Sequence, residues 1–348
     1  MSPYVMTILL SSLGLGTVTT FASSHWLLAW MGLEINTLAI IPLMAQHHHP
    51  RAVEAATKYF LIQATAAAMI LFASTMNAWA TGEWDINNLP DPFASVTLTI
   101  ALALKIGMAP VHLWMPEVLQ GLDLLTGLVM STWQKLAPFA LIIQTTQATN
   151  PALLTSLGLL SSLVGGWNGL NQTQLRKVLA YSSIAHMGWM VIVLQYSPQL
   201  TMIALGMYIL VTSAAFLTLK ALTSTKVNTL AMAWSKNPAL TSVSLLALLS
   251  LGGLPPLTGF MSKWLILQEL AKQNLPITAT IMALTALLSL FFYLRLCHAM
   301  TLTVFPNTSN FTPQWRTLAT HASLPATLAV VVAIGLLPLT PAVLMMPT

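Results

Sequence analysis

Charged residues are scarce in this 348-residue chain: they make up only 6% of it, whereas 56% of its residues are hydrophobic. An ordinary soluble domain carries roughly 25% charged residues. Runs of about 20 apolar residues, the length of a helix that crosses the hydrocarbon core of a bilayer, recur from one end to the other. The composition therefore excludes a soluble domain and predicts an all-α polytopic membrane protein.

Cysteine is almost absent as well. Cys297 is the single one, so an internal disulfide and an iron–sulfur cluster held by four thiolates are both excluded. The chain also lacks a phosphate-binding loop, a dinucleotide fingerprint and a nucleophile elbow. Its glycines near residue 252 do not form such a motif, because they lie in a predicted membrane helix that no strand precedes. We therefore expect no redox chemistry and no bound cofactor in this chain alone.

Clusters of basic or metal-binding residues are missing too. The 13 basic residues are scattered rather than gathered into a stripe, which argues against nucleic acid. The histidine triplet at 47–49 has no cysteine or acidic residue next to it, so a polar loop is favoured over a metal site. No basic leader or cleavage site precedes the first apolar run, and we expect the first helix to stay in the mature chain.

The apolar runs predict about eleven transmembrane helices. Ser23 and Ser24 are the only break between the first two runs, and one kinked helix there would reduce the count to ten. The predicted helices are 3–22, 25–45, 56–80, 93–118, 124–145, 152–171, 175–195, 199–223, 240–271, 276–304 and 323–345.

Basic residues fall in alternate loops of the eleven-helix arrangement, as the positive-inside rule requires. They follow the second, sixth, eighth and tenth helices, whereas the loop after the third helix is acidic and the loops after the fifth and seventh are uncharged. This alternation predicts an N-terminus on the basic side of the membrane and a C-terminus on the opposite side.

Two predicted helices contain breaks. Pro110 interrupts the fourth, and Pro255 and Pro256 interrupt the ninth after two glycines. Because the broken helices are five apart, two five-helix repeats would have opposite orientations, the inverted-repeat arrangement of secondary transporters. We therefore predict a single membrane domain, 1–348, made of one repeat at 1–145, a second at 146–304, and a loop with a C-terminal helix at 305–348.

Four ionisable residues lie deep inside apolar runs: Glu34, Lys105, Lys135 and Lys263. Each costs about 2.5 to 3.5 kcal/mol at the centre of a spanning helix. Burial can lower a lysine pKa by as much as about 3 to 5 units, into a range where the amine takes and releases protons. The four residues predict charge movement, with Lys105 as the partner of Glu34. The structural alternatives are polar contacts between helices or, for Lys105, snorkelling.

Two histidines are weaker candidates for the same path. His112 lies just beyond the break of the fourth helix, and His186 lies inside the seventh. Histidine titrates near neutrality and suits a proton relay. A hydrogen-bonded histidine in the core is an equally good interpretation of either position.

Three segments resemble the signature regions of the antiporter-like subunits of respiratory complex I. They are KIGMAPVHLWMPE at 105–117, LRKVLAYSSIAHMGWM at 175–190 and LLSLGGLPPLTGFMSKW at 248–264. With the opening helices, the resemblance covers nearly the whole chain and points to the animal mitochondrial branch of the family. Full-length antiporter-like relatives have fourteen helices, so the first three would be missing here.

The resemblance implies a proton-pumping subunit of the membrane arm of NADH:ubiquinone oxidoreductase, in the mitochondrial inner membrane. Its partners would be other membrane-arm and accessory subunits and lipids, while NADH, FMN, iron–sulfur clusters and quinone would bind elsewhere in the complex. The family's midplane axis would map onto Glu34 with Lys105, then Lys135, then Lys263.

Two other functions use the same features. A stand-alone cation/proton antiporter would need the same lysines and broken helices, but it would work without partner subunits. A scaffold that only holds neighbouring pumps together would tolerate loss of Lys105 and Lys263.

Overall fold

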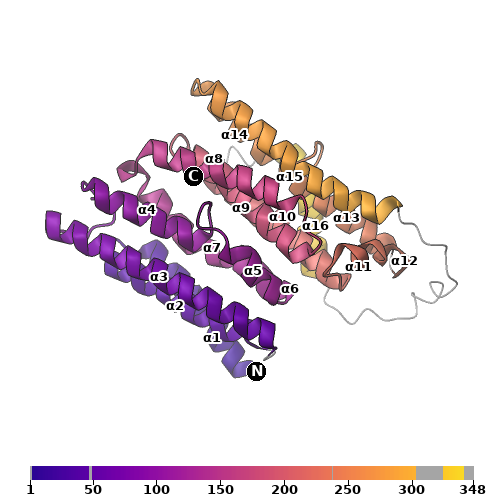
Figure 1. The fold of residues 1–348 in the computed structure, drawn as a ribbon, viewed down its shortest axis with the longest axis horizontal. Helices are drawn as coiled ribbons and strands as arrows, with labels where there is room; N and C mark the ends of the chain where they lie inside the picture. The colour runs from indigo at the N-terminus through magenta and orange to yellow at the C-terminus, as the bar shows by residue number, and fades with distance from the viewer. Residues whose placement is uncertain (1, 47–48, 237, 303–323, 341–348) are drawn as a thin grey trace. The chain divides into compact units, whose positions relative to one another are not determined.

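The computed structural model describes residues 2–46, 49–236, 238–302 and 324–340 (Figure 1). These residues form helices and no strand; isolated bridges join His25 to Asp85 and Gln174 to Lys226. Five helices among them are long and apolar enough to cross a membrane: α1 (Pro3–Ala22), α2 (Trp26–Met44), α3 (Pro50–Thr81), α10 (Pro198–Ala221) and α15 (Pro276–Leu302). The all-α polytopic prediction is confirmed, whereas the count of eleven spans stays a prediction.

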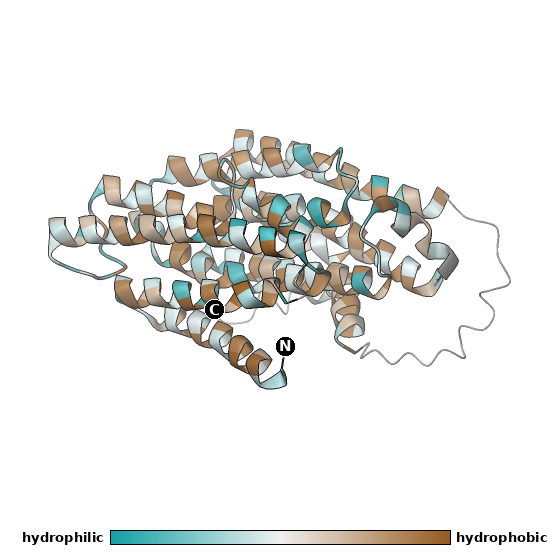
Figure 2. Ribbon diagram, turned by 60° about the horizontal axis from the view of Figure 1, so that its bottom comes forward, coloured by the Kyte–Doolittle hydropathy of each residue, from teal (hydrophilic) through white to brown (hydrophobic). Residues whose placement is uncertain are grey.

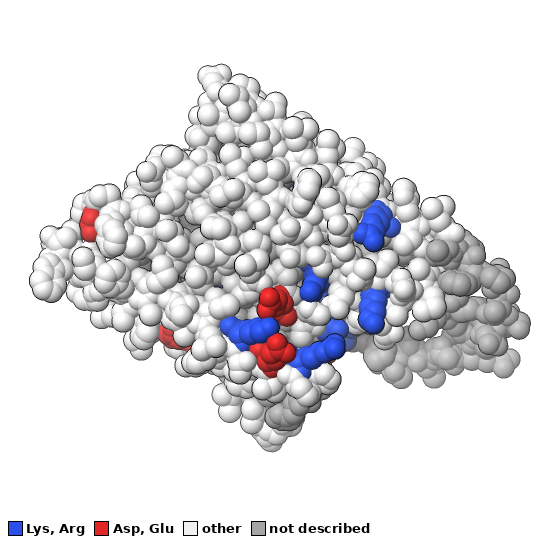
Figure 3. Space-filling view, viewed as in Figure 1, with Lys and Arg blue, Asp and Glu red and all other residues white. Residues whose placement is uncertain are grey.

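The helices are predominantly apolar along their length, with hydrophilic positions inside them as well as at their ends (Figure 2). On the face drawn in Figure 3, most of the surface is uncharged. Some predicted features lie outside the described residues: His47, His48, Arg316 after the tenth predicted helix, and the end of the last predicted helix.

The chain divides into two compact units, residues 1–161 and 162–348, with the division inside α8 (Pro151–Gly169). In unit 1, α3 packs against α2, α4 (Pro92–Ile106) and α5 (Trp114–Gly121), and α7 (Trp133–Gln144) packs against α1, α2 and α4. Helices α1 and α2 approach closely where glycines face each other. A Cβ on Gly32 would lie 2.6 Å from the Thr19 hydroxyl and 2.9 Å from the Gly16 carbonyl oxygen.

The predicted fifth helix is interrupted rather than continuous. It consists of α6 (Leu124–Ser131) and α7, with Thr132 between them. The Thr132 hydroxyl donates to the Leu128 carbonyl at 2.7 Å, and Pro138 has no amide proton to give the carbonyl four residues earlier. Lys135 therefore lies in the first turn of α7.

In unit 2, α10 packs against α9 (Leu175–Val193), α13 (Pro238–Gly252), α14 (Thr258–Lys272) and α16 (Leu324–Gly335). Two short helices, α11 (Val227–Ala231) and α12 (Ala233–Lys236), precede α13. Two 3-10 turns complete the described chain, η1 (Thr146–Ala148) in unit 1 and η4 (Leu337–Leu339) after α16. The C-terminal helix therefore packs into unit 2.

Both predicted helix breaks are confirmed, and both are closed by the same cap. Helix α4 ends at Gly107 (φ 82°) and α13 ends before Gly253 (φ 77°), in the left-handed region that favours glycine. In each case the next amide reaches back five residues, from Met108 to the Ala103 carbonyl at 2.9 Å and from Leu254 to the Leu249 carbonyl at 3.3 Å. The second half-helices, α5 and α14, begin after the prolines.

Candidate functional site

A small cavity in unit 1 is lined by both Lys105 and Lys135. Its volume is about 10 Å³, close to the smallest space that holds one water molecule. Lys105 is 5% exposed and Lys135 is 2% exposed, so both amines lie inside the protein. Lys105 comes from the last turn of α4 and Lys135 from the first turn of α7, two helices that pack together.

Glu34 is partly buried on α2, next to this cavity rather than in its lining. Its carboxylate accepts a hydrogen bond from the Thr37 hydroxyl at 3.2 Å, and Thr37 does line the cavity. Within the described part of the chain, Glu34 forms no direct ion pair with Lys105. The predicted pairing of Glu34 with Lys105 is therefore not made by direct contact.

At Lys105 the backbone carbonyl makes a tertiary hydrogen bond, whereas the amine makes none with a described residue. Its Nζ atom has no hydrogen-bond partner among the described residues. Its carbonyl, freed by the helix break, accepts a hydrogen bond from Gln63 Nε2 at 3.3 Å, and the neighbouring Leu104 carbonyl accepts one from Trp114 Nε1 at 3.1 Å. The break therefore has satisfied carbonyls beside an amine that makes no hydrogen bond with a described residue.

Uncharged polar residues complete the cavity, and the sequence analysis missed them. Asn36, Gln63, Gln134 and Tyr59 all line it. Gln134 donates to the Asn36 carbonyl at 3.3 Å, whereas neither polar atom of the Asn36 side chain bonds to a described residue. The signal that points to them is an amide inside an apolar run, which in a membrane needs a partner as a charge does.

His112 lies between the half-helices of unit 1 and does not line the cavity of the two lysines. It is 5% exposed, and its Nδ1 atom is 3.2 Å from the Pro110 carbonyl oxygen. A ring nitrogen bonded to the carbonyl of the break is consistent with either interpretation of this histidine.

A second cavity, in unit 2, brings Lys263 and His186 together. Its volume is about 20 Å³, enough for a water molecule. The His186 ring lies 5.6 Å from the Tyr208 ring, centroid to centroid, and Tyr208 shares a hydrogen bond with Ser183. The predicted distal lysine and the predicted histidine thus line one space.

Lys263 is anchored by its amine. Its Nζ donates to the Gly252 carbonyl at 2.8 Å, and the side chain is 7% exposed. Because Gly252 ends α13, the ammonium interacts with the negative end of that helix. A Cβ on Gly253 would lie 2.9 Å from Lys263 Cδ and 3.0 Å from its Nζ, so the glycine makes room for the lysine.

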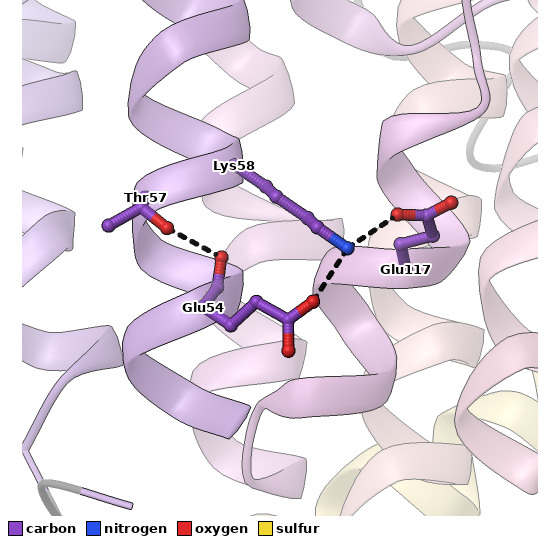
Figure 4. A network of polar contacts seen from close by, with 4 residues as sticks. All are labelled: Glu54, Thr57, Lys58 and Glu117. Carbon is purple, nitrogen blue, oxygen red and sulfur yellow. Dashed lines mark hydrogen bonds and ion pairs between the residues drawn. The ribbon is translucent and has the colours of Figure 1, made fainter. Parts of the chain in front are cut away.

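An exposed charge network lies on the outer face of unit 1 (Figure 4). Lys58 on α3 contacts Glu54 at 2.8 Å, one turn earlier, and Glu117 on α5 at 2.9 Å. All three side chains are at least 42% exposed. The network connects α5 to α3 but lies outside the lysine cavity.

Two family models match the chain in succession. Residues 23–289 match the membrane region of the NADH:quinone oxidoreductase/Mrp antiporter family, and residues 290–344 match the C-terminus of NADH dehydrogenase subunit 2. The first match contains Glu34, both lysines of the first cavity, and Lys263. The resemblance inferred from the three signature segments is confirmed.

Relatives match over the full chain. The NADH-ubiquinone oxidoreductase chain 2 of Danio rerio is 73% identical and that of Carassius auratus is 74% identical, each over 100% of both chains. A chain of respiratory complex I from Thermus thermophilus with bound aureothin is 31% identical, with a TM-score of 0.85 over 99% of this chain and 80% of that one. A chain of the Mrp complex from Dietzia sp., 15% identical over 97% of this chain and 75% of that one, shares the fold with a TM-score of 0.81. The chain belongs to the family of NADH-ubiquinone oxidoreductase chain 2 proteins.

Proposed function

We propose that this chain is a membrane-arm subunit of proton-translocating NADH:ubiquinone oxidoreductase in the mitochondrial inner membrane, and that it moves protons through its buried lysines. The observation that carries the proposal is the cavity shared by Lys105 and Lys135. Two amines that face one space of water-molecule size have a route for a proton between them.

The first step is electrostatic. A change in the charge of Glu34 alters the field at Lys105 without any contact having to break. A proton leaving the Lys105 ammonium passes through water in the cavity to the neutral amine of Lys135, so Lys105 loses the charge that Lys135 gains. Asn36, Gln63 and Gln134 supply donors and acceptors that hold such water.

The distal step uses unit 2. Lys263 receives the proton as an ammonium that the Gly252 carbonyl stabilises, and His186 faces the same cavity as a relay. The order of these steps is part of the proposal. His112, beside the first break, is a side branch of the path in this proposal.

Redox chemistry belongs to other subunits in this proposal. The chain has one cysteine and no dinucleotide fingerprint, so NADH, FMN, iron–sulfur clusters and ubiquinone bind elsewhere. Its partners are the other membrane-arm and accessory subunits and the membrane lipids. The basic loops support an N-terminus on the matrix side and a C-terminus on the intermembrane side.

A native gel is the first test of the proposal. Membranes solubilised in mild detergent are separated, and the position of this chain is compared with NADH-oxidising activity. Comigration supports the complex I subunit, whereas migration as a small inactive species, while complex I stays intact, supports a stand-alone cation/proton antiporter.

The lysines are tested in the assembled complex. Lys105→Ala and Lys263→Ala should each abolish NADH-driven proton translocation in vesicles, with assembly checked on the same gel. Lys58→Ala is the matched control, because it removes an exposed lysine from the same chain. Normal translocation by both buried-site variants would leave only a scaffold function.

A further inference from the structure

Two hydroxyls, one on each side of the unit 2 break, donate hydrogen bonds to the same carbonyl oxygen of the C-terminal helix. Ser250, in the last turn of α13, donates to the Ala333 carbonyl at 2.8 Å, and Thr258, the first residue of α14, donates to the same oxygen at 2.6 Å. The two hydroxyl oxygens are 3.3 Å apart. Ser250, Thr258 and Ala333 are all 0% exposed, so no solvent competes for these hydrogen bonds.

These hydroxyls differ from their neighbours in where they donate. Elsewhere in α13, Ser244 donates to the Thr241 carbonyl and Thr241 to the Pro238 carbonyl, each at 2.8 Å within the same helix. A hydroxyl has a single proton, so Ser250 gives up that local bond to reach α16. Thr258 is the first residue of α14 and has no earlier turn of its own helix to donate to. The pair is therefore a tertiary contact that spans the break.

We propose that Ser250, Thr258 and the Ala333 carbonyl form a clasp that holds α13 and α14 in the arrangement in which the Lys263 amine reaches the Gly252 carbonyl. This inference rests on the proton-translocating function proposed above. It makes Ser250 and Thr258 positioning residues for Lys263 and makes the C-terminal helix part of the pumping machinery.

The geometry links the clasp to the lysine directly. Gly252 lies two residues after Ser250 on α13, and Lys263 lies five residues after Thr258 on α14. The 2.8 Å contact between the Lys263 amine and the Gly252 carbonyl is therefore set by how the last turn of one half-helix sits against the first turn of the other. The clasp fixes those two turns to one oxygen atom.

The accepting Ala333 carbonyl and the two donating hydroxyls lie in segments of the chain that match different family models. Ser250 and Thr258 lie within residues 23–289, which match the shared NADH:quinone oxidoreductase/Mrp antiporter region, whereas Ala333 lies within residues 290–344, which match the subunit 2 C-terminus. The C-terminal segment thus acts on the break at the point where the shared region carries its lysine.

The test compares two double variants in the assembled complex. Ser250→Ala with Thr258→Val removes both hydroxyls of the clasp, and Ser244→Ala with Thr241→Val removes two equally buried hydroxyls from α13 itself. A net hydrogen bond changes an equilibrium by about fivefold. We expect the clasp variant to slow NADH-driven proton translocation at least about fivefold, and the α13 variant less than about twofold.

Rescue separates positioning from general stability. Thr258→Ser keeps the hydroxyl and should translocate protons normally, whereas Thr258→Val alone should be slowed; these single variants also serve where the double variant fails to assemble. Normal translocation by the clasp variants, with translocation lost in Lys263→Ala, would overturn the clasp and leave the proposed function standing. Normal translocation by assembled Lys263→Ala would overturn both.

Discussion

The two broken helices have the same cap but use their lysines in opposite ways. In unit 1, Lys105 precedes the break and its amine has no hydrogen bond to a described residue, while Gln63 donates to the freed Lys105 carbonyl. In unit 2, Lys263 follows the break and its amine takes the freed carbonyl itself. In the proposed function, the first lysine responds to a nearby charge and the second holds a proton at a helix end.

The second half-helices are also fastened differently. Helix α5 is connected to α3 by the exposed Lys58–Glu117 pair, whereas α14 is connected to α16 by the Thr258 hydroxyl, which has no solvent exposure. Solvent screens an exposed pair but does not reach a buried one. Unit 2 therefore has the more firmly fixed break.

The largest difference is expected from Gly253→Ala against Gly107→Ala. Both place a side chain at positive φ, which costs about 1–2 kcal/mol, and both should lower the thermal midpoint of the complex. Only the new methyl at residue 253 would meet the lysine, at 3.0 Å from its amine, and displace it from the Gly252 carbonyl. Losing a hydrogen bond to a charged group costs about 1.5–3 kcal/mol, so proton translocation should fall roughly tenfold or more.

The control for this prediction is the glycine of unit 1. A Cβ on Gly107 would lie 3.2 Å from the Trp114 ring and 3.3 Å from Met115 Sδ, and no lysine atom is among its nearest neighbours. Translocation by Gly107→Ala should therefore fall much less. Equal losses of proton translocation in the two variants would mean that translocation depends on the glycine cap of unit 2 and not on the contact between the Lys263 amine and the Gly252 carbonyl.

The next comparison removes the amines. Lys263→Met leaves the Gly252 carbonyl buried without a donor, at a cost of about 1–3 kcal/mol. Lys105→Met removes an amine that makes no hydrogen bond with a described residue, so its cost should be smaller or absent. Both variants should lose proton translocation, while thermal unfolding of the solubilised complex should show a clear loss of stability only for Lys263→Met. The reverse order of stabilities would contradict the asymmetry.

A third comparison tests what satisfies the freed carbonyl in unit 1. Gln63 occupies there the place that the Lys263 amine occupies in unit 2, and Gln63→Leu should cost about 1–3 kcal/mol of stability. Because Lys105 itself remains, translocation should be reduced rather than lost. Gln134→Leu is the matched control, since Gln134 lines the same cavity but bonds a carbonyl within α2. Equal destabilisation by both variants would show that the carbonyl at the break depends on its hydrogen bond no more than a carbonyl within α2 does.

Much of this asymmetry could not be predicted from the sequence. The long apolar runs, the prolines and the glycines before them place both breaks correctly, because each removes backbone hydrogen bonds locally. The four ionisable residues are found by their depth alone. Which atoms they meet depends on packing between distant elements, such as Gln63 with the Lys105 carbonyl, 42 residues apart.

The tertiary hydrogen bonds of the Ser250 and Thr258 hydroxyls could not be predicted from the sequence either. Ser250 and Thr258 look like any other small polar residues in apolar helices, and nothing local distinguishes them from Ser244. Their acceptor lies 83 and 75 residues further along the chain. The interruption at Thr132 was missed for a related reason, since its hydroxyl competes with the helix in a way that the apolar pattern does not record.

The smallest effect is expected from removing the ion pairs that connect α5 to α3. Lys58→Met removes both ion pairs of the network in Figure 4, but the three side chains are exposed and solvent-screened, so the thermal midpoint and the translocation rate should not change measurably. The matched change in unit 2 is Lys272→Met, which removes the exposed end of the Lys272–Glu269 pair within α14. Repeating both measurements at low salt would strengthen any residual effect of either pair. A large loss from Lys58→Met alone would mean that the exposed network fixes the first break as firmly as the buried hydroxyls fix the second, and the two units would then differ only in how they hold their lysines.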